Sequence, residues 1–131
     1  MNTVLIVEDD RNLLRLYQAE LETEGYRVVT ASNGSEAAER VALETPDVIV
    51  MDIRMPGRDG LDTMAEILRE YGRIPIILNT AYSSYLDDFL TWAAEAYIIK
   101  SGDLEPLKNK IREILAAHAS PCDPPRNDDG R

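Results

Sequence analysis

Five short apolar runs, each followed by a segment with helical periodicity, constrain the fold of this 131-residue chain more than any other feature. The runs are continuous rather than alternating, which is typical of parallel strands buried on both faces of a sheet. They cover Val4–Val7, Val28–Thr30, Val48–Met51, Ile76–Leu78 and Tyr97–Ile99. Parallel strands need crossover connections, and these are right-handed. The (βα)₅ order therefore predicts an open α/β sheet with helices on both sides.

Each segment between or after these runs carries one apolar face at helical spacing. The first helix is expected to end before Gly25, the second to begin with a capping box made by Asn33 and Glu36, and the fifth to begin with Asp103 as its N-cap. The apolar positions are Leu14, Tyr17 and Leu21; Ala37, Ala38, Val41 and Ala42; Leu61, Met64, Ile67 and Leu68; Leu86, Phe89, Leu90 and Ala93; and Leu104, Leu107, Ile111 and Leu115.

The apolar periodicity stops near Ala119, where the sequence continues as SPCDPPRNDDGR. Such a polar, proline-rich segment cannot bury enough surface to offset its chain entropy. We predict one folded domain over residues 1–119 and a disordered tail or the start of a linker over 120–131. The sequence leaves open whether the chain is a complete protein or part of a longer one.

Polar side chains follow four of the runs at the point where each run ends. In open parallel α/β sheets, sites form outside the carboxyl ends of the strands. If the first strand lies centrally, next to the third and fourth, these side chains meet at one edge. They are Glu8, Asp9 and Asp10 after the first run, Asp52 after the third, Thr80 after the fourth and Lys100 after the fifth.

Carboxylates that crowd together repel one another, and a hard divalent cation with oxygen ligands relieves the repulsion. We expect Glu8, Asp9 and Asp52 to hold Mg²⁺ or Mn²⁺, and Asp10 to cap the following helix. An acidic run alone is more often a solvated loop, but here Thr80 and Lys100 accompany it. A carboxylate beside Mg²⁺ and a lysine can attack phosphorus, and Asp52 is the best candidate nucleophile.

The segments VLIVEDD, PDVIVMDIRMPGRDG, IPIILNTA and AYIIKS resemble the receiver domain of two-component response regulators, from about Thr3 to His118. The resemblance implies a flavodoxin-like doubly wound sheet with strand order 2-1-3-4-5. It also implies that a histidine kinase or phosphotransfer protein phosphorylates Asp52. Glu8, Asp9 and Asp52, with the main-chain carbonyl of Arg54, would then hold the Mg²⁺.

The same resemblance assigns roles to three residues after the later strands. Thr80 would bond the phosphoryl group, and Lys100 would pair with it. Tyr97 would turn inward when phosphorylation draws Thr80 toward the site. Phosphorylation would thereby change the surface along the fourth helix, fifth strand and fifth helix, where a downstream effector protein binds. A phosphorylation-dependent homodimer is left open.

This chain departs from the family pattern in two places. Ser101 stands where the family has a proline after the lysine, so we hypothesise a strained cis bond between Lys100 and Ser101. Between Thr80 and Lys100 the chain is also a couple of residues shorter than the common family pattern, and the turn usually written with glycine reads Ala93-Ala94-Glu95-Ala96. The fourth helix carries several aromatic side chains, and Tyr85 and Trp92 are predicted to bind a partner. Arg54 and Tyr82 lie two positions beyond Asp52 and Thr80 and are predicted to tune the rate of dephosphorylation.

The formal net charge of −10 argues against direct binding to nucleic acid or to an anionic membrane surface. The single Cys122 excludes an internal disulfide, and no apolar run approaches the roughly 20 residues of a membrane span. No basic segment with a cleavage site precedes the first strand. A cytoplasmic location is the resulting expectation.

Two alternative functions remain beside the phosphorylation switch, which is not an enzyme beyond catalysing its own phosphorylation and dephosphorylation. A haloacid-dehalogenase-like phosphatase would use the same aspartate and Mg²⁺, but it needs a second aspartate where this chain has Arg54. A receiver that docks or dimerises without phosphorylation is disfavoured by the intact set of Glu8, Asp9, Asp52, Thr80 and Lys100, and mildly favoured by Ser101.

Overall fold

The computed structural model describes residues 2–52, 60–71, 74–80, 96–99 and 103–118. Within these ranges the chain forms five strands and four helices. They are β1 (Thr3–Val7), α1 (Arg11–Thr23), β2 (Arg27–Ala31), α2 (Gly34–Glu44), β3 (Val48–Met51), α3 (Gly60–Tyr71), β4 (Ile76–Thr80), β5 (Ala96–Ile99) and α4 (Glu105–His118). The predicted fourth helix, over Leu86–Ala93, lies outside the described residues. The helix labelled α4 therefore corresponds to the predicted fifth helix.

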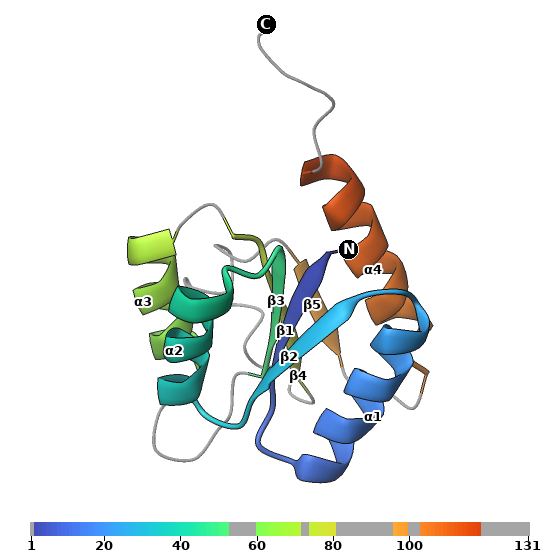
Figure 1. Cartoon of the computed structure of the whole chain (residues 1–131), viewed down its shortest axis with the longest axis horizontal. Coiled ribbons are helices and arrows are strands. Elements are labelled where there is room, and N and C mark those ends of the chain that lie inside the picture. Colours follow the sequence, from blue (N-terminus) through green and yellow to red (C-terminus); the bar gives the residue numbers. More distant parts are fainter. Residues whose placement is uncertain (1, 53–59, 72–73, 81–95, 100–102, 119–131) are drawn as a thin grey trace, which may run out of the picture.

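The strands form one parallel sheet in the order β2-β1-β3-β4-β5, which confirms the predicted topology. Figure 1 shows α1 and α4 on one side of the sheet and α2 and α3 on the other. β1 and β3 lie in the interior of the sheet, next to each other. The residues that follow these two strands are therefore brought together at one edge.

The core has two layers because successive strand residues point to opposite faces of the sheet. Leu5 and Val7 pack with Val41 of α2 and Ile67 of α3, whereas Val4 and Ile6 pack on the α1 and α4 side. On that side the predicted apolar positions Tyr17, Leu21, Leu107, Ile111 and Leu115 are all buried. Burial on both faces explains why β1 and β3 read as continuous apolar runs.

Two expectations about burial were wrong. β2 was expected to be buried on both faces, but it is the edge strand, and most of its residues are only partly covered. Ala42 was placed on the apolar face of α2, yet it is exposed. The buried stripe of that helix runs through Gly34, Ala37 and Val41, and Ala42 lies a further 100° around the helix axis.

The predicted helix ends follow the expected capping chemistry. The side chain of Asn33 accepts a hydrogen bond from the Glu36 N–H at 2.9 Å, but the Glu36 carboxylate reaches one residue further back, to the N–H of Ser32. Gly25, just after α1, has a φ of +93°, a left-handed conformation that glycine adopts at low cost. Over the described ranges, no helix has the length and apolar character needed to cross a bilayer.

Candidate functional site

The register of the β1–β3 pair places two acidic residues side by side. Val7 lies opposite Met51, and the Asp52 N–H continues the ladder by donating to the Val7 carbonyl at 3.1 Å. On the other side of β1, the Glu8 N–H donates to the Ala31 carbonyl of β2 at 3.0 Å. Backbone hydrogen bonds thus fix both residues at the carboxyl edge of the sheet, so their positions do not depend on a loop.

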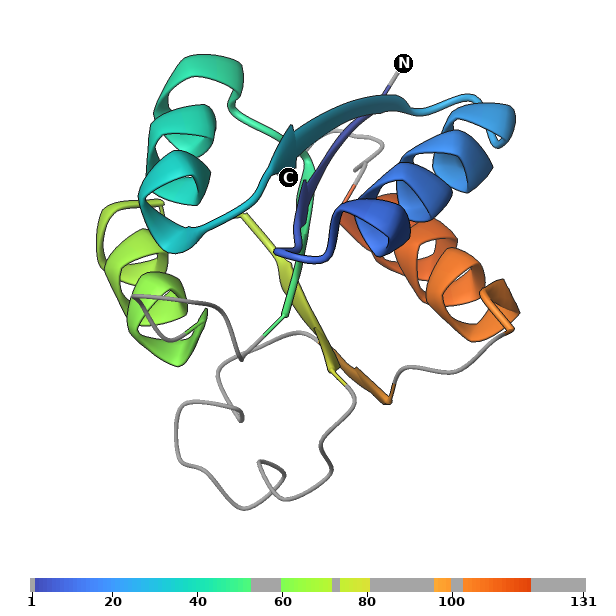
Figure 2. The same cartoon turned by 90° about the horizontal axis from the view of Figure 1, so that it is seen from below.

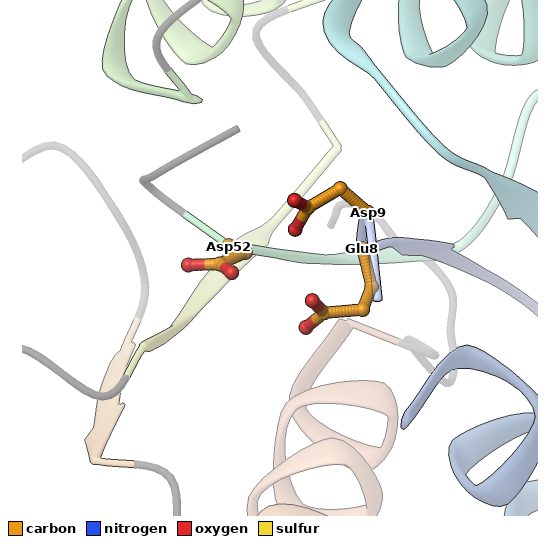
Figure 3. A group of neighbouring side chains, drawn as sticks. All are labelled: Glu8, Asp9 and Asp52. Carbon is orange, nitrogen blue, oxygen red and sulfur yellow. The ribbon is translucent and has the colours of Figure 1, made fainter. Parts of the chain in front are cut away.

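Glu8, Asp9 and Asp52 converge at this edge. One carboxylate oxygen from each lies within 4.8 Å of the others, and Figure 3 shows the three side chains turned toward a common point. Only 2% of Glu8 and 7% of Asp52 is exposed, whereas Asp9 is open to solvent. The cluster therefore has a buried floor and one exposed wall through which an ion or a phosphodonor can approach.

Asp10 is separated from this cluster by its role at the start of α1. Its side chain accepts hydrogen bonds from the N–H groups of Asn12 at 2.9 Å and Leu13 at 3.3 Å, which confirms the predicted N-cap. The Asp10 N–H in turn donates to the Glu8 carboxylate at 3.2 Å. The helix start therefore helps to orient Glu8 within the cluster.

The donor set matches a hard divalent cation. Two unit charges about 5 Å apart repel by roughly 3 kcal/mol at an effective dielectric constant of 20, and three carboxylates contain three such pairs. A bound cation converts this repulsion into attraction. Oxygen-only ligands at strand ends suit Mg²⁺, and Mn²⁺ accepts the same donors. The residues present thus fit the metal that the sequence predicts.

The remaining predicted site residues are only partly within the described ranges. Thr80 is the last residue of β4 and lies opposite Ile99 of β5, so both strands end at the edge that carries the acids. Tyr97 lies within β5, opposite Leu78. Arg54, Tyr82, Tyr85, Trp92 and the Lys100–Ser101 bond lie outside the described residues.

One polar contact beside the site was missed from the sequence. Asn79, which precedes Thr80, is 4% exposed, and its amide nitrogen donates to the Tyr17 hydroxyl of α1 at 3.2 Å. The asparagine that directly follows the apolar run of β4 was the available signal, because a buried amide needs a hydrogen-bond partner. Tyr17 had been assigned only to the apolar face of α1. The bond ties the carboxyl end of β4 to that helix.

Comparison with known proteins gives a consistent picture. The family model described as the response regulator receiver domain matches residues 4–112. The crystal structure of the response regulator protein TrrA from Thermotoga maritima in complex with Mg²⁺-BeF is 39% identical, with a TM-score of 0.84, and the match covers 87% of this chain and 99% of that one.

Two further solved structures are similar over nearly their whole length. TrrA in complex with the histidine kinase ThkA is 40% identical, with a TM-score of 0.82 and coverage of 88% of this chain and 99% of that one. The BeF₃-activated receiver domain of RstA from Klebsiella pneumoniae is 33% identical, with a TM-score of 0.78 and coverage of 87% and 98%.

Proposed function

Because this chain belongs to the response regulator receiver family, we propose that Asp52 accepts a phosphoryl group from a histidine kinase or phosphotransfer protein in a Mg²⁺-dependent reaction. Receiver domains are signalling switches rather than classical enzymes. The observation that carries the proposal is the meeting of Glu8, Asp9 and Asp52 within 4.8 Å at the ends of two adjacent strands. A similar receiver, TrrA, forms a complex with a histidine kinase, which supports the kinase as donor.

The three carboxylates have different parts in this reaction. A carboxylate oxygen of Asp52 attacks the phosphorus, the bond to the donor nitrogen breaks, and an acyl phosphate forms. Glu8, Asp9 and Asp52, with the main-chain carbonyl of Arg54, would hold Mg²⁺. The bound cation would offset the negative charge of the phosphoryl oxygens. Burial of Asp52 limits the access of water to the product, while the exposed Asp9 side leaves an entry path.

The output would follow from ordering of the residues at the ends of β4 and β5. Thr80 would bond the phosphoryl group, Lys100 would pair with it, and Tyr97 would turn inward. β4 and β5 are parallel and end at the same edge of the sheet, which supports the convergence of Thr80 and Lys100 on Asp52. Phosphorylation would change the affinity for a partner only as far as that partner binds the phosphorylated and unphosphorylated arrangements with different free energies.

The partner surface that we propose includes Tyr85 and Trp92 of the predicted fourth helix, with β5 and α4 beside it. An effector protein or a second copy of the chain would bind there. Arg54 and Tyr82 would set the rate at which the acyl phosphate is hydrolysed. A cytoplasmic location, and the division into a domain over 1–119 and a tail over 120–131, remain predictions.

Incubation with acetyl phosphate and Mg²⁺, followed by intact mass spectrometry, tests the proposal. The wild-type chain should gain one phosphoryl group, and Asp52→Asn should gain none. Asp47→Asn is a matched control because Asp47 lies at the opposite end of β3, where its carboxylate accepts the Thr3 N–H at 2.7 Å. An unmodified wild-type chain would favour the receiver that acts without phosphorylation. Equal labelling of Asp52→Asn would move the acceptor elsewhere.

A further inference from the structure

A second candidate site lies at the free edge of the sheet, at the end of β2 whose Ala31 accepts the Glu8 N–H. β2 is the edge strand, and Figure 2 shows it crossing between α1 and α2. Residues from both helices and from the end of β2 line a cavity of about 380 Å³. The lining residues that carry the argument are Arg11, Arg15, Thr30, Ser32, Glu36 and Arg40.

This cleft is positively charged in a chain whose net charge is −10. Arg11 and Arg15 lie one helical turn apart on α1, and Arg40 comes from α2 on the other side of the cleft. Glu36 is the one acid among the lining residues. Hydrogen bonds from the Ser32 N–H and hydroxyl lower the pKa of Glu36, so its carboxylate is ionised and offsets one of the three charges.

The three arginines contrast with other cations in the described part of the chain. Arg27, Lys108, Lys110 and Arg112 each form an ion pair with a glutamate. Among the described residues Arg11, Arg15 and Arg40 form no ion pair, as is also true of Arg69 on α3, although the charge of Arg40 attracts the Glu36 carboxylate and helps to lower its pKa. Like charges at positions i and i+4 of a helix are destabilising, so an anionic ligand in the cleft would relieve the repulsion between Arg11 and Arg15.

The backbone of β2 offers a second kind of contact in the same cleft. The Arg27 N–H donates to the Asn2 carbonyl, and the Ala31 carbonyl accepts from Glu8, so both residues point their polar groups toward β1. Successive residues of a strand alternate in this direction. The N–H and carbonyl of Thr30 therefore point away from β1, toward the open edge.

We propose that this cleft binds an extended acidic segment of a partner protein, which adds as a strand to the free edge of β2. Its backbone pairs with Thr30, and its carboxylates contact Arg15 on one wall and Arg40 on the other. Guanidinium groups suit this role because their planar fork bonds a carboxylate with two hydrogen bonds. Strand addition of this kind takes its affinity from the backbone and its specificity from the side chains.

A small anion explains less of the site than a peptide does. Phosphate would engage the arginines but would leave the outward N–H and carbonyl of Thr30 without a strand partner. A protein segment satisfies both. The contacts lie on α1, α2 and β2 and include none of the three clustered carboxylates. The cleft nevertheless borders the phosphoryl-transfer site, because Ala31 accepts the Glu8 N–H.

Fluorescence anisotropy with a labelled peptide of alternating Glu and Val residues, about ten residues long, tests the proposal. The wild-type chain should bind this peptide saturably, and added salt should weaken binding by screening. Arg15→Glu and Arg40→Glu should each weaken binding by at least about fivefold, because each change replaces attraction with repulsion. Arg69→Glu is the matched control: it makes the same charge change at an exposed arginine of α3, outside the cleft.

A peptide of the same charge with proline in place of valine separates strand addition from simple anion binding. Proline cannot donate to the ladder, so this peptide should bind at least about fivefold more weakly. Amide NMR shifts on titration with the Glu-Val peptide should centre on Thr30. Equal affinity for the two peptides, equal loss in Arg69→Glu, or no binding to the wild-type chain would each overturn the proposal. Labelling of Asp52 in the Arg15 and Arg40 variants shows whether the phosphorylation site is intact.

Discussion

Two groups of acidic side chains in this molecule are arranged in opposite ways. Between α1 and α4, Lys108 of α4 donates to Glu20 of α1 at 2.8 Å and lies 3.9 Å from Glu24, which also pairs with Arg112 at 3.2 Å. At the carboxyl edge of the sheet, Glu8, Asp9 and Asp52 turn their carboxylates toward one another. In the first group positive and negative side chains alternate, whereas in the second three negative side chains lie close together.

The difference separates a structural use of charge from a functional one. Between α1 and α4 the positive charges belong to the chain itself. Lys108 and Arg112 lie where the two helices pack together, and they neutralise the glutamates there. In the strand-end cluster like charges are held together by backbone hydrogen bonds, so the sheet maintains a repulsive arrangement. Folds keep such an arrangement where an external ligand compensates it. Substitutions in the two groups should therefore affect different measurements.

Asp9→Asn should have the largest effect on function. Loss of one charged ligand should lower the Mg²⁺ affinity by at least about tenfold and slow labelling by acetyl phosphate in proportion at subsaturating Mg²⁺. Asp10→Asn is the matched control, since asparagine is an equally good N-cap and Asp10 is already committed to α1. Titration of Mg²⁺ by calorimetry measures the affinity. Equal losses of Mg²⁺ affinity in both variants would mean that Asp9 is no more important for the ion than Asp10, which contradicts its role as a ligand.

Addition of Mg²⁺ should also stabilise the folded chain. A cation at ten times its dissociation constant contributes about 1.4 kcal/mol if it binds only the folded state. The melting temperature of the wild-type chain should rise with Mg²⁺, and that of Asp9→Asn should rise much less at the same concentration. Lys108→Met should respond as strongly as the wild type. If Mg²⁺ failed to raise the melting temperature of Lys108→Met, the ion pairs between α1 and α4 would be coupled to the metal site.

Much of this contrast could be predicted from the sequence, because it depends on local patterns. The run before Glu8 and the run before Asp52 both indicate buried parallel strands, and the carboxyl ends of adjacent parallel strands meet. The pairing of Lys108 with Glu20 could not be predicted, since 88 residues separate them and an isolated lysine on a helix is usually solvated. The same holds for the cleft that Arg15 and Arg40 line together beside β2.

Lys108→Met should lower the melting temperature by a few degrees while leaving labelling of Asp52 unchanged. The methionine keeps most of the apolar stem in a site where the Lys108 side chain is 10% exposed, but it loses the bond to Glu20. That hydrogen bond raises the pKa of Lys108 above its ordinary value of 10.5, although burial opposes the shift. Thermal denaturation followed by circular dichroism measures the change.

The sign of the Lys108 shift fixes its pH dependence. A pKa raised on folding adds stability that is complete below the unfolded value and is lost as the pH rises through the folded value. The difference in melting temperature between wild type and Lys108→Met should therefore be constant from about pH 7 to about pH 9 and shrink above about pH 10.5. A difference that already falls near neutral pH would contradict this origin.

Asp10→Ala tests whether the start of α1 affects the neighbouring metal site. It removes the N-cap of α1 and should destabilise the chain by about 1 kcal/mol. It leaves the three carboxylates of the cluster in place, and the Asp10 N–H that donates to Glu8 is a backbone group. We expect Mg²⁺ affinity to change by less than about threefold, because only the helix start loosens. A larger loss of affinity would show that the Asp10 carboxylate, and not only the Asp10 backbone N–H, is needed to orient Glu8.

Arg112→Ala should have the smallest effect, even though it removes an ion pair from the same network as Lys108. The Arg112 side chain is 57% exposed, and Glu24 keeps Lys108 at 3.9 Å when Arg112 is gone. Exposed pairs contribute about 0 to 1 kcal/mol, because both partners are well solvated when separated. Chemical denaturation should place Arg112→Ala well above Lys108→Met in stability. Equal losses would show that the network acts as a unit, with its stability shared between the exposed and the buried cation.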